Sequence, residues 1–197
     1  MTLSTHVNNM CRSACLAIYK IGQIRRFIDQ STAERLVHAF VTSQLDTNNS
    51  LLYGLPGSQI AKLQRVQNIA IRMITCIKGN YDINVVRREV LHWLPIKDRI
   101  VFKILLIIYK ALHGLAPSYI SDLLTNYTPR RTLRSSSLAL LQPPTSREVS
   151  TSYYGNRVFS VAAPKLWNNI PLTIRKADSL AKFKHLLKTY LFKNPTV

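Results

Sequence analysis

The feature that most constrains this chain is an apolar run, IVFKILLIIYKAL, at residues 100–112. A membrane-spanning helix needs about 20 mostly apolar residues with few charges, and here Lys103 and Lys110 interrupt the run. At about 100° per residue, Arg99, Lys103 and Lys110 fall on one narrow face of a helix, and apolar side chains cover the remaining faces. The run therefore predicts a helix over about 95–113 that is buried on most sides and has one basic edge. It does not predict a membrane span.

The same periodicity predicts further helices and a mainly α fold. We expect a first helix from Ser4 to residue 20, a second over 31–43 with Ser31 and Glu34 as its capping box, and a third over 58–78 that Gly79 closes. The remaining expected helices cover 82–91, 117–124, about 164–169 and 178–192. For residues 153–161 the pattern leaves an extended segment and a helix equally open.

Composition divides the chain into four expected regions. Residues 125–152 are rich in Ser, Thr, Pro and Arg, which is typical of a loop or mobile linker rather than a core. We therefore predict a helical region at 1–80, a buried helical region at 81–124, this basic linker at 125–152 and a helical extension at 153–197.

Charge is the outlier in the composition. Lys and Arg number 27 against nine Asp and Glu, so the net charge is +18. Such a charge favours a polyanionic partner, which is usually nucleic acid and less often an anionic membrane. Three groups of basic residues are candidates for phosphate contact, although each can also be solvated: Arg65 and Arg72 in the 58–78 helix, the edge formed by Arg99, Lys103 and Lys110, and the cluster Arg130, Arg131 and Arg134.

The residues that enzyme chemistry needs are sparse. The nine carboxylates include no Asp-Asp pair, and the chain has neither a Gly-rich phosphate loop followed by Lys nor a G-x-S-x-G elbow. We therefore predict no catalytic residue, no metal and no cofactor. Cys11 and Cys15 are interpreted as buried small residues rather than zinc ligands, and Trp93 and Trp167 as core anchors rather than base-stacking platforms. The start of the chain has no signal-peptide pattern, so we expect an intracellular protein, nuclear or cytoplasmic.

Several stretches resemble the region that follows the polymerase palm in non-LTR retrotransposons (LINEs) of the jockey-like and chicken-repeat-like groups. Their order and spacing match over nearly the whole chain, with one departure, LDTNNSLLYGLP in place of the common LDYCNSLLYGLP. The matching stretches are HAFVTSQLDTNNSLLYGLP (38–56), IAKLQRVQNIAIRMIT (60–75), LHWLPIKDRIVFKILLIIYKALHGLAPSYISDLL (91–124), RTLRSS (131–136) and YYGNRVFSVAAPKLWNNIPLTIRKADSLAKFKHLLKTYLF (153–192).

The resemblance implies a helical thumb-like bundle followed by a mostly helical carboxy-terminal extension. It also implies that the catalytic aspartates of the polymerase belong to a palm domain upstream, so that this chain is not an enzyme on its own. The implied partners are RNA, DNA or an RNA–DNA hybrid and the missing palm and fingers domains. Two alternatives stay open: a free-standing basic nucleic-acid chaperone or interaction module, and a pseudogene product without function.

Overall fold

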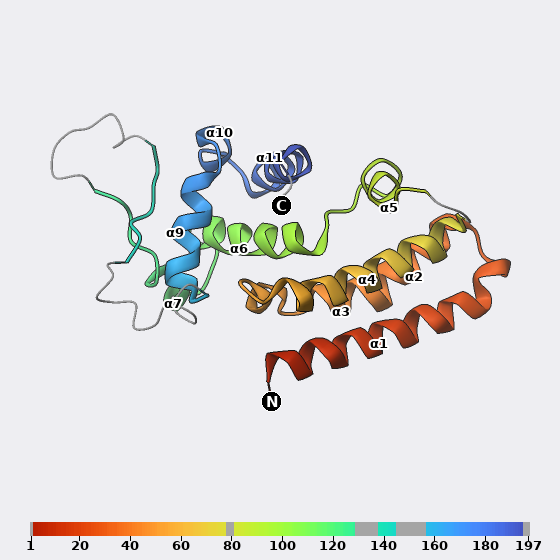
Figure 1. The fold of residues 1–197 in the computed structure, drawn as a ribbon. Helices are drawn as coiled ribbons and strands as arrows, with labels where there is room; N and C mark the ends of the chain where they lie inside the picture. The colour runs from red at the N-terminus through yellow and green to blue at the C-terminus, as the bar shows by residue number, and fades with distance from the viewer. Residues whose placement is uncertain (1, 78–80, 129–137, 145–156, 195–197) are drawn as a thin grey trace. The chain divides into compact units, whose positions relative to one another are not determined.

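A computed structural model describes residues 2–77, 81–128, 138–144 and 157–194 of the chain, and these residues are mainly helical (Figure 1). The chain divides into two compact units, residues 1–100 and 101–197, which are described separately below. This division falls inside a helix, whereas the sequence places its boundaries after residues 80, 124 and 152. Among the described residues, none of the helices combines the length and apolar character that crossing a membrane requires.

The first unit begins with a three-helix bundle. Its first and third helices run in the same direction, because Gln59 donates to Ser4 near their starts and Arg25 reaches the carbonyl of Ile74 near their ends. The middle helix runs back in the opposite direction and packs on both of them, and a π-helical turn interrupts it. The elements are α1 (Leu3–Ile24), α2 (Gln30–Val37), the π-helical turn His38–Thr42, α3 (Ser43–Asp46), a 3₁₀ turn (Asn49–Leu52) and α4 (Gly57–Thr75).

Apolar residues at helical spacing build the core of this bundle. The buried side chains of α1 recur every three or four residues, and those of α4 follow the same rule with one polar exception, Gln67. These residues are Val7, Met10, Ala14, Ile18 and Ile21 in α1, and Leu63, Val66, Gln67, Ala70, Ile71 and Ile74 in α4.

Arg25 ties the end of α1 to the end of α4. Its Nε donates to the carbonyl of Met73 at 3.1 Å, its Nη2 to the carbonyl of Ile74 at 2.7 Å, and its Nη1 to the carbonyl of Ile28 at 2.7 Å. The last carbonyls of a helix have no partner within the helix, and a cation also suits the negative end of the helix dipole. One side chain therefore satisfies two of the carbonyls in the last turn of α4.

The segment after α4 packs back on it through polar contacts. Buried Gln67 donates to the carbonyl of Leu94 at 3.0 Å, and the side-chain oxygen of Gln64 accepts from the Ile96 amide at 3.0 Å. Ile96 is the first residue of α6 (Ile96–Leu112), so Gln64 caps an otherwise orphan N–H group. Gln64 therefore joins α4 to α6. Between them lie α5 (Ile83–Val85) and a π-helical turn (Val86–Val90).

The second unit is organised around three stacked aromatic rings. Tyr109 of α6 stacks on Phe183 with 4.2 Å between ring centroids, Trp167 lies 6.0 Å from Phe183, and the Tyr109 hydroxyl donates to the carbonyl of Ala177 at 2.8 Å. Both tryptophans are core residues as predicted, since Trp93 and Trp167 are buried. The helices of this unit besides α6 are α7 (Ser118–Ser121), α9 (Phe159–Asn169), α10 (Leu172–Arg175) and α11 (Leu180–Lys193).

Part of the expected linker belongs to this core, which corrects the interpretation of 125–152. Leu141 is buried, its amide donates to the side-chain oxygen of Asn168 at 3.0 Å, and its carbonyl accepts from the same amide group at 2.8 Å. The indole N–H of Trp167 donates to the carbonyl of Ala139 at 2.9 Å. Residues 138–144 are therefore held by α9 through long-range contacts that a composition argument does not detect.

The predicted helices exist, but several of their starts were wrong. α1 begins at Leu3 with Thr2 as its cap, and it extends to Ile24. Asp29, not Ser31, caps α2, because the Asp29 carboxylate accepts from the Thr32 amide at 3.1 Å. Hydrogen bonds from the Thr32 side chain and from the Thr32 amide lower the pKa of Asp29.

The end of α4 and the start of α9 also differ from the prediction. α4 stops at Thr75, and Cys76 takes the left-handed conformation (φ 52°) that was assigned to Gly79, while residues 78–80 lie outside the described part of the chain. α9 begins at Phe159, so Pro164 lies inside the helix rather than at its start. Val161, Ala162 and Ala163 are buried. The helix continues past the proline because this tertiary packing outweighs the low helix propensity of proline.

Candidate nucleic-acid interface

The two parallel helices of the first unit carry basic residues and no acidic residue. Between Leu3 and Ile24 and between Gly57 and Thr75 there is no Asp or Glu. The basic residues within these two helices are Arg12, Lys20, Lys62, Arg65 and Arg72. The first unit is therefore polarised, because its acidic residues all lie on other elements.

Helical geometry places most of these residues on one surface. Lys62 donates to the side-chain oxygen of Asn8 at 2.9 Å, which marks where α1 and α4 meet at the rim of the bundle. On α1, Arg12 and Tyr19 lie within about 40° of Asn8, and the core residues lie on the other side. The same projection on α4 places Arg65 within about 60° of Lys62, and it also points away from the core.

We name this surface the α1/α4 face. Its members are solvent-accessible and combine charge with apolar area: Arg12, Arg65 and Arg72 are exposed, Tyr19 is 66% exposed and Ile69 is 45% exposed. Helix α2 packs on both of these helices through other residues. The α1/α4 face consists of Arg12, Tyr19, Lys62, Arg65, Ile69 and Arg72.

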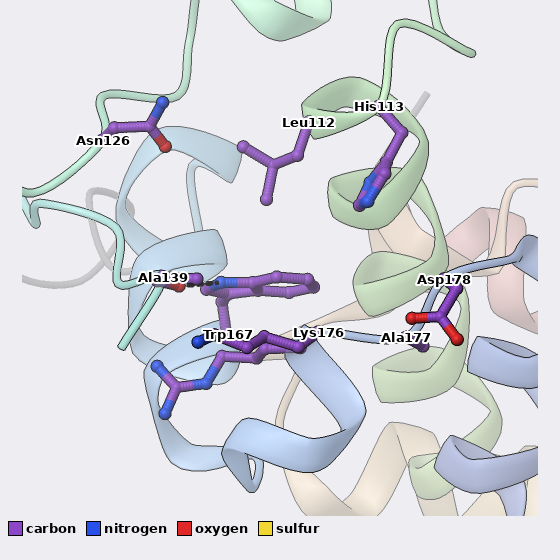
Figure 2. Close-up of a pocket in the computed structure, with 9 residues that line it drawn as sticks. Leu112, His113, Asn126, Ala139, Trp167, Lys176, Ala177 and Asp178 are labelled. Carbon is purple, nitrogen blue, oxygen red and sulfur yellow. Dashed lines mark hydrogen bonds between the residues drawn. The ribbon is translucent and has the colours of Figure 1, made fainter. Parts of the chain in front are cut away.

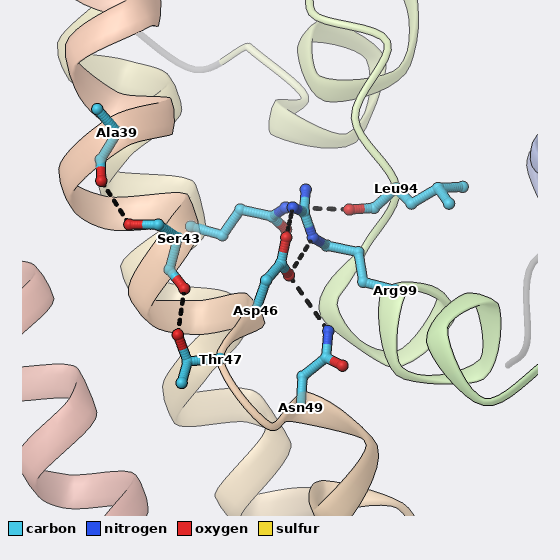
Figure 3. A network of polar contacts seen from close by, with 8 residues as sticks. Ala39, Ser43, Asp46, Thr47, Asn49, Leu94 and Arg99 are labelled. Atoms are coloured by element: carbon cyan, nitrogen blue, oxygen red, sulfur yellow. Dashed lines mark hydrogen bonds and ion pairs between the residues drawn. The ribbon is translucent and has the colours of Figure 1, made fainter. Parts of the chain in front are cut away.

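The predicted basic edge of α6 is divided in the structure. The guanidinium of Arg99 forms an ion pair with the carboxylate of Asp46, in which Nε donates to Oδ1 at 2.9 Å and Nη2 contacts Oδ2 (Figure 3). Arg99 retains only 18% of its side-chain exposure, so its donors serve an internal contact. Asp46 is held in turn by Asn49, whose side chain donates to it at 3.3 Å. On the same helix, Lys103 is exposed and Lys110 is half-buried.

The cluster Arg130, Arg131 and Arg134 lies outside the described residues, so its assignment stays a prediction. The structure does bring Arg65 and Arg72 together on the exposed side of α4. The sequence reasoning missed Arg12, Tyr19 and Lys62, which join them on the α1/α4 face. The signal for these three residues was the absence of acidic residues over 1–28 and 57–81.

Other chemistry at this face is limited. Among the described residues, no group of three or more His, Cys, Asp or Glu side chains is placed to hold a metal ion. Cys11 is half-buried and Cys15 is exposed, so the expectation that both are buried was wrong for Cys15. Burial raises the pKa of the Cys11 thiol, and the neighbouring Cys15 raises it further while Lys62 opposes the shift.

No protein-family model, curated protein or solved structure matches this chain. The function is therefore inferred from the α1/α4 face and from the resemblance of the sequence to non-LTR retrotransposons.

Proposed function

We propose that this chain is the carboxy-terminal, post-palm portion of a LINE-type reverse transcriptase and that it binds RNA, DNA or their hybrid without polymerase chemistry of its own. The sequence resemblance supports the origin. The observation that carries the binding proposal is the α1/α4 face, on which two parallel helices present arginines and no carboxylate. Its remaining partners, on this proposal, are the palm and fingers domains of the parent protein.

The spacing of the face suits a nucleic-acid backbone. Arg65 and Arg72 are two helical turns apart, a rise of about 10 Å along α4, which corresponds to about three base-pair steps of 3.4 Å. Arg12 extends the charge to α1, and Tyr19 offers a ring on which an unpaired base can stack. Such contacts position a polynucleotide without reading its sequence.

The test is the salt dependence of binding to an RNA–DNA hybrid of arbitrary sequence. We expect the logarithm of the binding constant to fall linearly with the logarithm of the salt concentration. Replacing Arg65 and Arg72 with Ala should reduce that slope by about 2, because each phosphate contact contributes about 1. The matched control is Lys20→Ala with Arg35→Ala, which removes the same charge from exposed positions off the α1/α4 face.

Equal slopes for the two double variants would reject the α1/α4 face as the binding surface. Binding that does not weaken with salt would reject phosphate recognition altogether. A strand-annealing assay with the chain alone separates the chaperone alternative, because a fragment that only grips a duplex should not accelerate annealing of complementary strands.

A further inference from the structure

Two exposed aromatic rings lie among the basic residues of the first unit. Tyr19 of α1 is 66% exposed, and Phe27, in the 3₁₀ turn Arg25–Phe27 that follows α1, is 73% exposed. Apolar ring area left in water costs free energy that burial would recover. Open rings beside cations are typical of proteins that bind unpaired nucleotides, because each ring offers a surface on which a base can stack.

The Phe27 ring is paired with a cation. The guanidinium of Arg26 lies over it, 4.6 Å from the ring centroid, and both side chains are exposed. Because Phe27 keeps most of its exposure, the ring stays accessible to a ligand. Bases stack on aromatic rings and on guanidinium planes alike, so Arg26 and Phe27 together form a second stacking platform beside that of Tyr19.

The spacing along α1 repeats the spacing of the arginines on α4. Arg12, Tyr19 and Arg26 follow one another at intervals of seven residues, about two helical turns, so they recur on nearly the same side of α1 and its continuation. Arg65 and Arg72 have the same interval on α4, which runs parallel to α1. The first unit therefore carries one row that contains rings beside a second row of arginines.

The second platform lies near the end of the arginine row. Arg25 donates to the carbonyls of Met73 and Ile74. Its neighbour Arg26 is therefore close to the last turns of α4, where Arg72 is exposed. The second platform thus continues the α1/α4 face at the carboxyl ends of both helices.

Only an unpaired strand can use both rows. The phosphates of a single strand and of a duplex are equally open to arginines. In a duplex, however, the bases are stacked on one another, and a side chain reaches the surface of a base only after that step is unstacked. A bound duplex would therefore leave both platforms in water, whereas a single strand can cover them.

The pocket of the second unit does not provide a comparable platform. Trp167 lines this pocket of about 440 Å³, but it is 1% exposed and its indole N–H donates to the carbonyl of Ala139 (Figure 2). Its ring is also stacked against Phe183 in the core, with 6.0 Å between centroids. Trp167 is therefore a core residue, unlike the two exposed rings of the first unit.

We propose that the α1/α4 face binds single-stranded RNA or DNA in preference to a duplex. Tyr19 and the Arg26–Phe27 platform stack on unpaired bases, while Arg65 and Arg72 contact the phosphates. This inference rests on the proposed function, because it names the form of nucleic acid that the same face binds. Every base has a surface that can stack, so the binding is not sequence-specific.

The test compares three labelled ligands of equal length by fluorescence anisotropy with the complete chain. They are a DNA strand, the same strand paired with complementary RNA, and an abasic DNA strand that keeps the phosphates but has no bases. At physiological salt we expect the single strand to bind more tightly than the hybrid, although the hybrid carries more phosphates. The abasic strand should bind more weakly than the intact strand, because it cannot stack.

Variants of exposed aromatic residues test the platforms directly. Tyr19→Ala and Phe27→Ala should each weaken binding of the single strand about fivefold or more and leave binding of the hybrid unchanged. Tyr19→Phe keeps the ring and should keep the affinity. The matched control is Tyr119→Ala, since Tyr119 is 67% exposed but lies in a segment, 114–128, that has no Lys or Arg. This control should leave both affinities unchanged.

The salt dependence separates this inference from the proposed function. Stacking is not ionic, so Tyr19→Ala should lower the affinity for the single strand by the same factor at every salt concentration. Arg65→Ala with Arg72→Ala should instead reduce the salt slope. If that slope falls as expected but the hybrid binds as tightly as the single strand, the inference is wrong and the proposed function stands. If none of the three ligands binds, both are wrong.

Three further results would overturn the inference alone. One is an equal loss of affinity in Tyr19→Ala and Tyr119→Ala, and another is an abasic strand that binds as tightly as the intact strand. The third is an unchanged affinity for the single strand in Tyr19→Ala together with a loss of self-association in sedimentation. That result would assign the Tyr19 ring to contact with a second copy of the chain.

Discussion

Arg25 offers the sharpest test of how the first unit is held together, because its neighbour Arg26 is a matched control. Arg25→Ala removes three hydrogen bonds, at 3.1, 2.7 and 2.7 Å, two of which satisfy carbonyls in the last turn of α4. A hydrogen bond to a charged group contributes about 1.5–3 kcal/mol. Arg25 is half-buried, so water replaces part of each bond, and we expect a total loss of about 3 kcal/mol.

The control variant, Arg26→Ala, separates the effect of losing these hydrogen bonds from the effect of losing one positive charge. Arg26 is exposed, and its guanidinium lies 4.6 Å above the ring of Phe27. Arg26→Ala should therefore cost at most about 0.5–1 kcal/mol. Both variants reduce the self-repulsion of a chain of net charge +18 equally. Arg25→Lys keeps the charge but not the planar fork, so it should show most of the loss of Arg25→Ala.

The assay is urea unfolding followed by the helical circular dichroism signal, with hydrogen exchange to locate the effect. A loss of about 3 kcal/mol lowers the urea midpoint by about 1–3 M, given typical denaturant slopes. The amides near the end of α4 should lose protection first. Equal midpoints for Arg25→Ala and Arg26→Ala would refute the reasoning, since the geometry assigns nearly all of the effect to one of them.

Three further predictions concern single contacts. Asp46→Asn should destabilise the first unit by about 1–2 kcal/mol in urea unfolding, a value between the limits for exposed and buried ion pairs. A double variant that also carries Arg99→Met should lose less unfolding free energy than the sum of the two single variants. Tyr109→Phe should cost about 1–2 kcal/mol in the same measurement, because the buried Ala177 carbonyl loses its donor. The pKa of Asp29 is lowered in the folded chain by hydrogen bonds from the Thr32 side chain and amide, so its stabilising effect is present above the unfolded value of about 3.9 and is lost as the pH falls through the folded value. Between pH 6 and pH 2 the thermal midpoint should therefore fall further in the unsubstituted chain than in Asp29→Ser, which keeps a cap that does not titrate.

The sequence by itself determined the helices and most of the residues that face inward. Hydrophobic periodicity is a local property of a helix, so the spacing of apolar residues identified α4, α6 and α11 before any long-range contact was known. The burial of Trp93 was predicted from its local sequence as well. The caps were less certain, because several candidates stand within a turn of each helix start, and Asp29 competed successfully with Ser31.

Only the tertiary structure decided which polar residues form contacts inside the protein and which remain accessible to a partner. Arg99 is engaged by Asp46, which lies 53 residues earlier in the chain, and Gln67 is buried against a segment 27 residues later. The α1/α4 face needed the packing of two helices that are far apart in the sequence. Arg175 is one of many basic residues in the sequence, and only the fold shows that it is buried. The physical reason is that periodicity describes one helix at a time, whereas the solvation and pairing of a charge depend on every element packed around it.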